Sequence, residues 1–125
     1  MEELVHAVQD YGFYGATAMI NAKRNVEFEA KVFHDIAEAF HDADCPYGCS
    51  ATGYALIGTA GQSTNFMNQY QDFINHIIQN RVFSASDIAT FQNLCNQWNS
   101  TDVYQSNFTP QVLRHFFGKP RPPKP

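Results

Sequence analysis

Cysteine, positive charge and long apolar runs are all scarce in this chain of 125 residues. Three cysteines are too few, and odd in number, for a disulfide framework, so we expect reduced thiols. The longest apolar run, GFYGATAMI, is far too short to span a bilayer. The N-terminal sequence MEELVHAVQD lacks the basic segment and the apolar run of a signal peptide. These absences predict an intracellular, cytoplasmic protein that does not contact a membrane.

Basic residues number eight against twelve acidic ones, and the net charge is −4. Three of the eight stand in the C-terminal sequence KPRPPKP, so the rest of the chain is more acidic still. Two of the expected helices have a helix–turn–helix outline, but the would-be recognition segment ASDIATFQNLCNQWNS contains no Lys or Arg. Because binding to a phosphate backbone depends on clustered Lys and Arg, nucleic acid is not an expected partner.

The composition otherwise fits one folded domain, because 44% of the residues are hydrophobic and 14% are aromatic. We expect residues 1–118 to form a single α-helical domain. Residues 119–125 are too rich in proline to join it, and they predict a disordered, basic tail.

Apolar residues recur with helical spacing through the first 43 positions. In residues 2–22 they follow alternating steps of four and three, which predicts a core-facing stripe of Leu4, Val8, Tyr11, Gly15, Ala18 and Ala22. A second stripe, from Val26 to Phe40, continues almost in phase. The region is therefore either one long helix or two helices that break within residues 21–25. A continuous helix of about 60 Å would favour a homodimer, since it is too long for a compact monomer.

Three further helices are marked by their termini. Ser63 is placed to cap one helix, and Ser84 or Ser86 to cap the next. Thr109 and Pro110 open a short last helix that stops at Gly118. No segment alternates as a strand would. The sequence therefore predicts an all-α compact bundle of four to five helices, with a long N-terminal helical region and a Pro-rich C-terminal tail.

The stretch HDIAEAFHDADCPYGC, residues 34–49, carries residue types that bind zinc. Helical spacing puts one face through His34, Glu38, His41 and Cys45, and Cys49 follows after a turn. The same face also carries charged residues and lies opposite the apolar arc, so a solvated helix face explains the pattern without metal. These charged residues are Glu27, Lys31, Asp35 and Asp42. A zinc-stabilised domain that uses His34, His41, Cys45 and Cys49 remains an alternative.

An enzyme needs a nucleophile, a base and an orienting group together, and no such set is assembled in the sequence. Gly53 and Gly58 have the spacing of a P-loop, but the lysine and hydroxyl residue that would contact phosphate and magnesium do not follow. Cys95 falls among apolar helical positions, where an inert core thiol is the ordinary expectation. We therefore expect a non-enzymatic protein without a cofactor, and a small Cys/His enzyme remains an alternative.

The N-terminal helical region has apolar residues on almost all of its sides. This is more apolar surface than a monomer of this size easily buries, and such surface is typical of protein–protein contact. Four large side chains fall away from the predicted core stripe and are the candidate partner-binding anchors: Phe13, Tyr14, Met19 and Ile20. The competing interpretation is that they pack against the later helices. The sequence thus predicts a protein-binding regulator or adaptor of the antagonist (inhibitor) type, which docks a helical apolar and aromatic face onto another protein. We also expect the N-terminal region to pair with a copy of itself in a homodimer.

Overall fold

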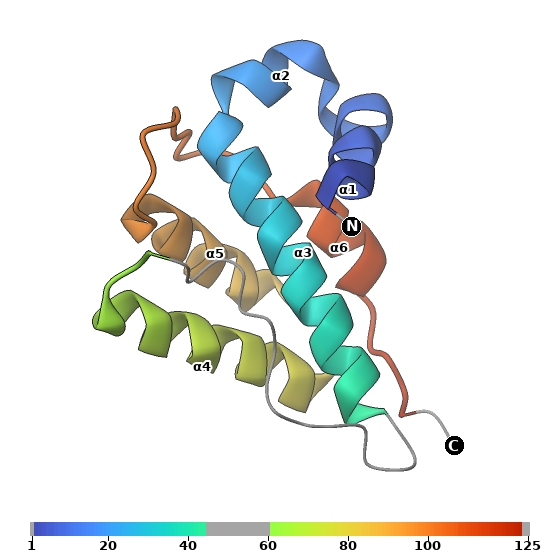
Figure 1. Ribbon diagram of the computed structural model, residues 1–125. Coiled ribbons are helices and arrows are strands. Elements are labelled where there is room, and N and C mark those ends of the chain that lie inside the picture. Colours follow the sequence, from blue (N-terminus) through green and yellow to red (C-terminus); the bar gives the residue numbers. More distant parts are fainter. Residues whose placement is uncertain (1, 45–60, 124–125) are drawn as a thin grey trace.

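The computed structural model describes residues 2–44 and 61–123, and all regular structure in these ranges is helical (Figure 1). The helices are α1 (Glu2–Val8), the π-helical segment η1 (Gln9–Tyr14), α2 (Gly15–Asn21), α3 (Lys23–Ala43), α4 (Thr64–Asn80), α5 (Ala85–Gln97) and α6 (Gln111–Phe117). The predicted all-α bundle is confirmed. Within the described ranges, no helix combines the length and the apolar character that crossing a membrane requires.

Helix α3 runs through the middle of the molecule, with α4 and α5 on one side and α1 and α6 on the other (Figure 1). Its fully buried Phe28 is surrounded by aromatic rings from α4, from α5 and from the residue directly after α5, at centroid distances of 5.2–6.3 Å. These rings belong to Phe66, Tyr70, Phe91 and Trp98. Burial of a side chain of this size contributes roughly 1.5–3 kcal/mol, so this aromatic cluster is the main support of the core.

The predicted caps of α4 and α5 are confirmed. The Ser63 hydroxyl accepts a hydrogen bond from the backbone N–H of Phe66 at 3.1 Å. The backbone N–H of Ser84 donates to Asp87 Oδ2 at 2.7 Å, as part of a capping box. Cys95 is buried in the core, as predicted, and burial raises the pKa of its thiol to about 12.

The N-terminal region is divided by two backbone breaks. Gly15 has a φ of 78°, a left-handed value that glycine adopts without strain, and the chain turns there from η1 into α2. Ala22 has a φ of −124° and separates α2 from α3. The second break lies within the predicted window 21–25, so the alternative with separate helices holds and a continuous helix over residues 2–43 does not form.

The core stripe predicted for residues 2–22 is wrong in its N-terminal part, although its last member, Ala22, is buried. Leu4 and Tyr11 are 68% and 90% exposed, whereas Val5 and Gln9 are buried. The prediction extended one α-helical period over the whole region. The backbone instead changes to a π-helix at Gln9 and leaves the helix at Gly15, so a single period does not apply.

Asp35 was expected on the solvated face of α3, and this expectation is also wrong. Its side chain is fully buried and its Oδ2 accepts a hydrogen bond of 2.6 Å from the Tyr70 hydroxyl. Helix α4 packs against α3 at this point and brings Tyr70 over the carboxylate. Burial raises the pKa of Tyr70, and the nearby Asp35 carboxylate adds to the effect.

The long connection between α5 and α6 is fixed by the first turn of α3. The buried Asn25 side chain forms two hydrogen bonds with the backbone of Gln105, donating to its carbonyl at 3.0 Å and accepting from its N–H at 2.8 Å. The Arg24 guanidinium donates to two carbonyls of the connection, those of Ser100 and Asp102, and to the Asn96 carbonyl in the last turn of α5. The path of the chain into α6 therefore depends on two neighbouring side chains.

Residues 119–123 have no regular secondary structure and are exposed. Arg121 pairs with Arg81 through the backbone, donating its N–H to the Arg81 carbonyl at 2.8 Å. The Arg81 guanidinium forms an ion pair with Asp44 at 2.8 Å. Both guanidinium groups lie over the Phe40 ring, at 5.3 Å for Arg81 and 5.0 Å for Arg121. The first part of the tail thus lies along the ends of α3 and α4, and disorder of the whole tail stays a prediction.

Candidate functional site

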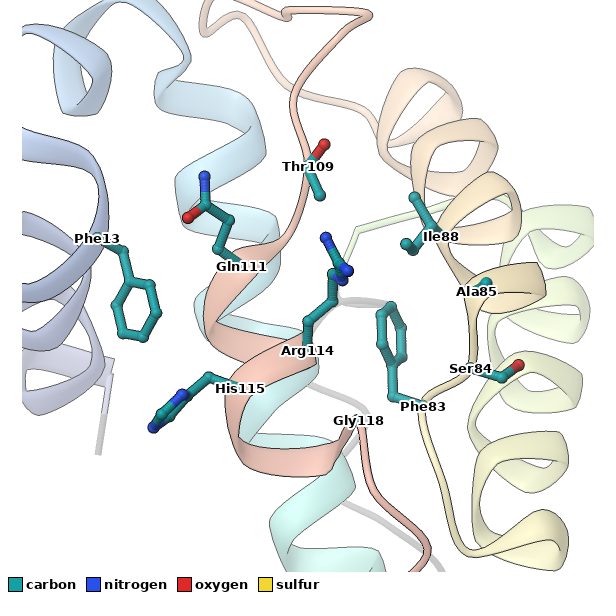
Figure 2. A pocket seen from close by; sticks show the side chains of 10 residues that line it. All are labelled: Phe13, Phe83, Ser84, Ala85, Ile88, Thr109, Gln111, Arg114, His115 and Gly118. Carbon is teal, nitrogen blue, oxygen red and sulfur yellow. The ribbon is translucent and has the colours of Figure 1, made fainter.

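An open groove of about 560 Å³ runs beside α6 (Figure 2). Its lining comes from η1, from the start of α5 and the loop before it, and from α6 and its two flanks. These residues are Phe13, Phe83, Ser84, Ala85, Ile88, Thr109, Gln111, Arg114, His115 and Gly118, and they are called here the α6 groove. A groove of this size, open to solvent and with both apolar and polar walls, is suited to a peptide or a side chain of another protein.

Arg114 and His115 point to different sides of α6. In Figure 2, Arg114 extends toward α5, whereas His115 extends toward Phe13. The Phe13 and His115 rings meet edge to face at a centroid distance of 5.4 Å. Arg114 and His115 are both exposed, so α6 presents one nitrogen-bearing side chain on each of these two sides.

A smaller, entirely apolar depression of about 170 Å³ adjoins α6 between α1 and α3. It is lined by Leu4, Val5, Val8, Phe33, Val112 and Phe116, and it is called here the apolar notch. Leu4 and Phe116 leave 68% and 50% of their surface exposed. The Phe116 ring packs edge to face on Phe33 at 5.4 Å and contacts His115 at 4.9 Å. Helix α6 therefore contributes residues to both the apolar notch and the α6 groove.

The position of α6 is set by the fully buried carboxylate of Glu29 on α3. Glu29 Oε2 accepts hydrogen bonds from the backbone N–H groups of Val112 and Leu113, at 3.1 and 3.3 Å. The first N–H groups of a helix have no partner within the helix, and the helix dipole favours negative charge at this end. A side chain from another helix thus caps α6.

The other oxygen of Glu29 binds the N-terminal region. Oε1 accepts hydrogen bonds from the Tyr14 hydroxyl at 2.7 Å and from Gln9 Nε2 at 2.8 Å. The Tyr14 hydroxyl in turn accepts the backbone N–H of Gln111 at 2.8 Å. Gln9 also donates to the Val26 carbonyl at 3.0 Å. One buried network therefore links η1, α3 and α6, and it holds the side chains of α6 in place.

Burial raises the pKa of the Glu29 carboxyl to about 7, against the effect of its four hydrogen bonds, which lower it. The pKa of Tyr14 is raised by burial and, to a smaller extent, by the neighbouring Glu29 charge. Neither group lines the α6 groove or the apolar notch. Their chemistry therefore supports the position of α6 and does not face a ligand there.

The four predicted anchors have different environments. Phe13 is half-buried and lines the α6 groove, and Tyr14 is half-buried with its hydroxyl in the Glu29 network. Met19 is half-buried and packs against the main core, whereas Ile20 is 71% exposed. Of these four residues, Phe13 alone lines the α6 groove, and none lines the apolar notch. Their role in partner binding stays a prediction.

The predicted zinc ligands fall only partly within the structure. His34 Nε2 lies 3.3 Å from a Glu38 oxygen, and the His41 side chain is 75% exposed beside Asp42. Within residues 2–44 and 61–123, no three His, Cys, Asp or Glu side chains gather as a metal site. Cys45 and Cys49 lie outside the described residues, so the zinc alternative stays a prediction.

A second groove, of about 450 Å³, lies between α4 and α5 and brings His76 within 3.6 Å of Asp87. Asp87 Oδ2 already accepts hydrogen bonds from the backbone N–H and the hydroxyl of Ser84, so this carboxylate serves as the cap of α5. The residues that line this groove include no cysteine. The groove therefore lacks the cysteine nucleophile that the alternative of a small Cys/His enzyme would use.

Two residues of this region, Glu29 and Arg114, were not predicted as site residues from the sequence. Glu29 lies between the apolar residues Phe28 and Ala30, and an acid next to core positions can be buried if polar groups donate hydrogen bonds to it. Arg114 gave no comparable signal, because a single arginine on a short amphipathic helix is ordinary.

Comparison with known proteins found no matching family model, no matching curated protein and no matching solved structure.

Proposed function

We propose that this protein is a non-enzymatic regulator or adaptor that docks onto a partner protein through α6 and its surroundings. The observation that carries the proposal is the exposure of two large apolar side chains, Phe116 on α6 and Leu4 on the neighbouring α1, on either side of the apolar notch. Phe116 and Leu4 are 50% and 68% exposed beside the apolar notch, and a contiguous exposed apolar surface is typical of protein–protein contact.

The rigidity of α6 supports the same proposal. Glu29 caps the helix, Tyr14 contacts its first residue, and the Phe83 N–H donates to the Phe117 carbonyl at 2.7 Å near its other end. A surface that is ordered before binding loses less conformational entropy on association, so a given contact area gives higher affinity. A helix of seven residues with this support at both ends fits a docking element.

Photo-crosslinking tests the proposal. A photoreactive phenylalanine analogue placed at Phe116 is expected to form a crosslinked adduct of defined mass in the cells of origin. The matched control carries the analogue at Met67 on α4, which is also exposed, at 42%. The proposal predicts that the adduct forms at position 116, is absent at position 67, and is lost on Leu4→Ser. The same adduct from both positions, or none from position 116, would contradict it.

Three finer features belong to the proposal: a cytoplasmic location, an antagonist role and a homodimer. The homodimer no longer has the support of a continuous N-terminal helix, because the chain breaks at Ala22. Native mass spectrometry of protein purified without chelator reports the number of subunits. It also reports bound zinc, so one spectrum tests the homodimer and the zinc-stabilised alternative together.

A further inference from the structure

The geometry points to an acidic peptide segment of the partner protein as the occupant of the α6 groove, with its carboxylates on Arg114 and its apolar side chains on the walls. This inference rests on the proposed function and names the chemistry of the partner. It concerns the α6 groove alone and does not involve the apolar notch.

Arg114 differs from the other arginines for which contacts are described. Arg24 donates to backbone carbonyls, and Arg81 pairs with Asp44. The guanidinium of Arg121 lies over the Phe40 ring. Across residues 2–44 and 61–123, no hydrogen bond or ion pair engages the Arg114 guanidinium, which extends into the α6 groove (Figure 2). A guanidinium forms two parallel hydrogen bonds with a carboxylate, so Arg114 is prepared for such a group.

The charge around Arg114 is of one sign. The lining of the α6 groove contains no Asp or Glu, although the chain as a whole has a net charge of −4. His115 lines the groove beside Arg114, and the exposed Lys119 follows Gly118 at its end. The groove thus carries the positive charge of Arg114, with Lys119 near its end and no carboxylate among its lining residues, on a protein of negative net charge. Charge complementarity of this kind selects an acidic partner and speeds its association.

The walls of the α6 groove select a peptide over a small anion. Phe13 and Ile88 are half-buried and lie on opposite sides of α6 in Figure 2, with Arg114 between them. A free phosphate would contact the arginine and leave both apolar walls exposed. A nucleic acid would meet only Arg114 and Lys119 here, too few basic residues to hold its phosphates on a protein with a net charge of −4. A peptide that alternates acidic and apolar residues satisfies the walls and the charge together.

Fluorescence anisotropy with the full chain tests the inference. The probe is a fluorescein-labelled peptide that alternates glutamate with leucine and phenylalanine, and its matched control carries glutamine in place of every glutamate. We expect the glutamate peptide to bind about tenfold more tightly or better, as one charge-assisted contact allows. Arg114→Gln is expected to remove this preference while leaving the glutamine peptide unaffected. Because Arg114 is exposed and has no described partner, the variant is expected to fold, and far-ultraviolet circular dichroism checks this.

Lys23→Gln is the control for net charge, since Lys23 is 56% exposed and its nearest carboxylate, Asp102, is 3.9 Å away. An equal loss of affinity in Lys23→Gln and Arg114→Gln would overturn the inference, because it would reflect overall charge. Absence of binding by the glutamate peptide would overturn it too. Displacement of the probe by inorganic phosphate at constant ionic strength would indicate a small-anion site instead.

The crosslinking experiment keeps the two proposals apart. If Arg114→Gln retains the adduct at position 116 and the glutamate peptide does not bind, the proposed docking function stands and the acidic-peptide inference fails. If the adduct is absent while the peptide binds, the α6 groove recognises acidic segments but the proposed docking through Phe116 is wrong.

Discussion

The Tyr14 hydroxyl donates a 2.7 Å hydrogen bond to the Glu29 carboxylate, across fifteen positions of the chain and two backbone breaks. The same hydroxyl accepts the N–H of Gln111, the first residue of α6. This pair therefore joins the beginning of the chain to its last helix through a buried oxygen. Substitutions at either residue report on the support of the candidate docking surface.

Glu29→Gln is expected to remove a pH dependence of stability. The pKa of Glu29 is about 7 in the folded state, compared with an ordinary value of 4.5. At a pH between these two pKa values, Glu29 is protonated in the folded state and deprotonated in the unfolded state. The free energy of unfolding of the wild type therefore falls as the pH rises from 4.5 toward 7, and Glu29 adds no further pH dependence above about 7. This difference between the folded and ordinary pKa values of Glu29 corresponds to a change of about 3 kcal/mol in the free energy of unfolding.

Urea unfolding at pH values from roughly 4 to 8, which bracket the two pKa values of Glu29, measures this effect. The difference in the free energy of unfolding between the wild type and Glu29→Gln isolates Glu29, because the two proteins share all other titrating groups. The free energy of unfolding of the wild type, relative to Glu29→Gln, should decline through the interval. Parallel curves for the two proteins would contradict the prediction.

Tyr14→Phe is expected to lower the free energy of unfolding by roughly 1–3 kcal/mol, because it removes a donor to a buried carboxylate and leaves the Gln111 N–H without its acceptor. Hydrogen exchange should show faster exchange at the amide of Gln111. Tyr11→Phe is the matched control, since Tyr11 is 90% exposed, and it should leave both measurements unchanged. Equal effects of the two substitutions would count against a role for the network.

Asn25→Ala is expected to destabilise the connection between α5 and α6 by roughly 1–3 kcal/mol, because the backbone N–H and carbonyl of Gln105 both lose their partner. Limited proteolysis should then cut within residues 99–108 before it cuts elsewhere. Lys23→Ala, two positions earlier, changes only an exposed ion pair and should behave as the wild type. Protection of residues 99–108 in Asn25→Ala would refute the prediction.

Cys95 is expected to resist iodoacetamide in the folded protein, because it is buried and its thiol has a pKa of about 12. Peptide mass mapping after brief alkylation at neutral pH should find Cys95 unlabelled in buffer and labelled in urea. Rapid labelling of Cys95 in buffer would be incompatible with its burial and would support the alternative of a cysteine enzyme.

The helices with strong termini were predictable from the sequence. Ser63 and Ser84 cap their helices through local contacts, within three residues of each cap, so the sequence contains the whole signal. Likewise, the apolar positions of α4 and the burial of Cys95 follow from a regular α-helical period.

The N-terminal face and the candidate site were not predictable in this way. The buried face of the N-terminal region depends on a π-helical segment and on the break at Gly15, and the α-helical period of the sequence indicates neither. The burial of Asp35 depends on Tyr70, which is thirty-five positions away. The α6 groove combines residues from Phe13 to Gly118, and such a combination exists only once the helices have packed.

The π-helical segment has a consequence for the tolerance of the chain to a single-residue deletion. Removing Gly12, whose position has no neighbouring atom within 4 Å of an added Cβ, would let the segment tighten into an α-helical turn. Because the tightening takes up the missing residue, the residues on both sides would keep their places: Val5 would stay buried, and Gln9 would still donate to Glu29. The π-helical segment thus gives the chain room to lose one residue while the carboxylate beneath α6 keeps its donors.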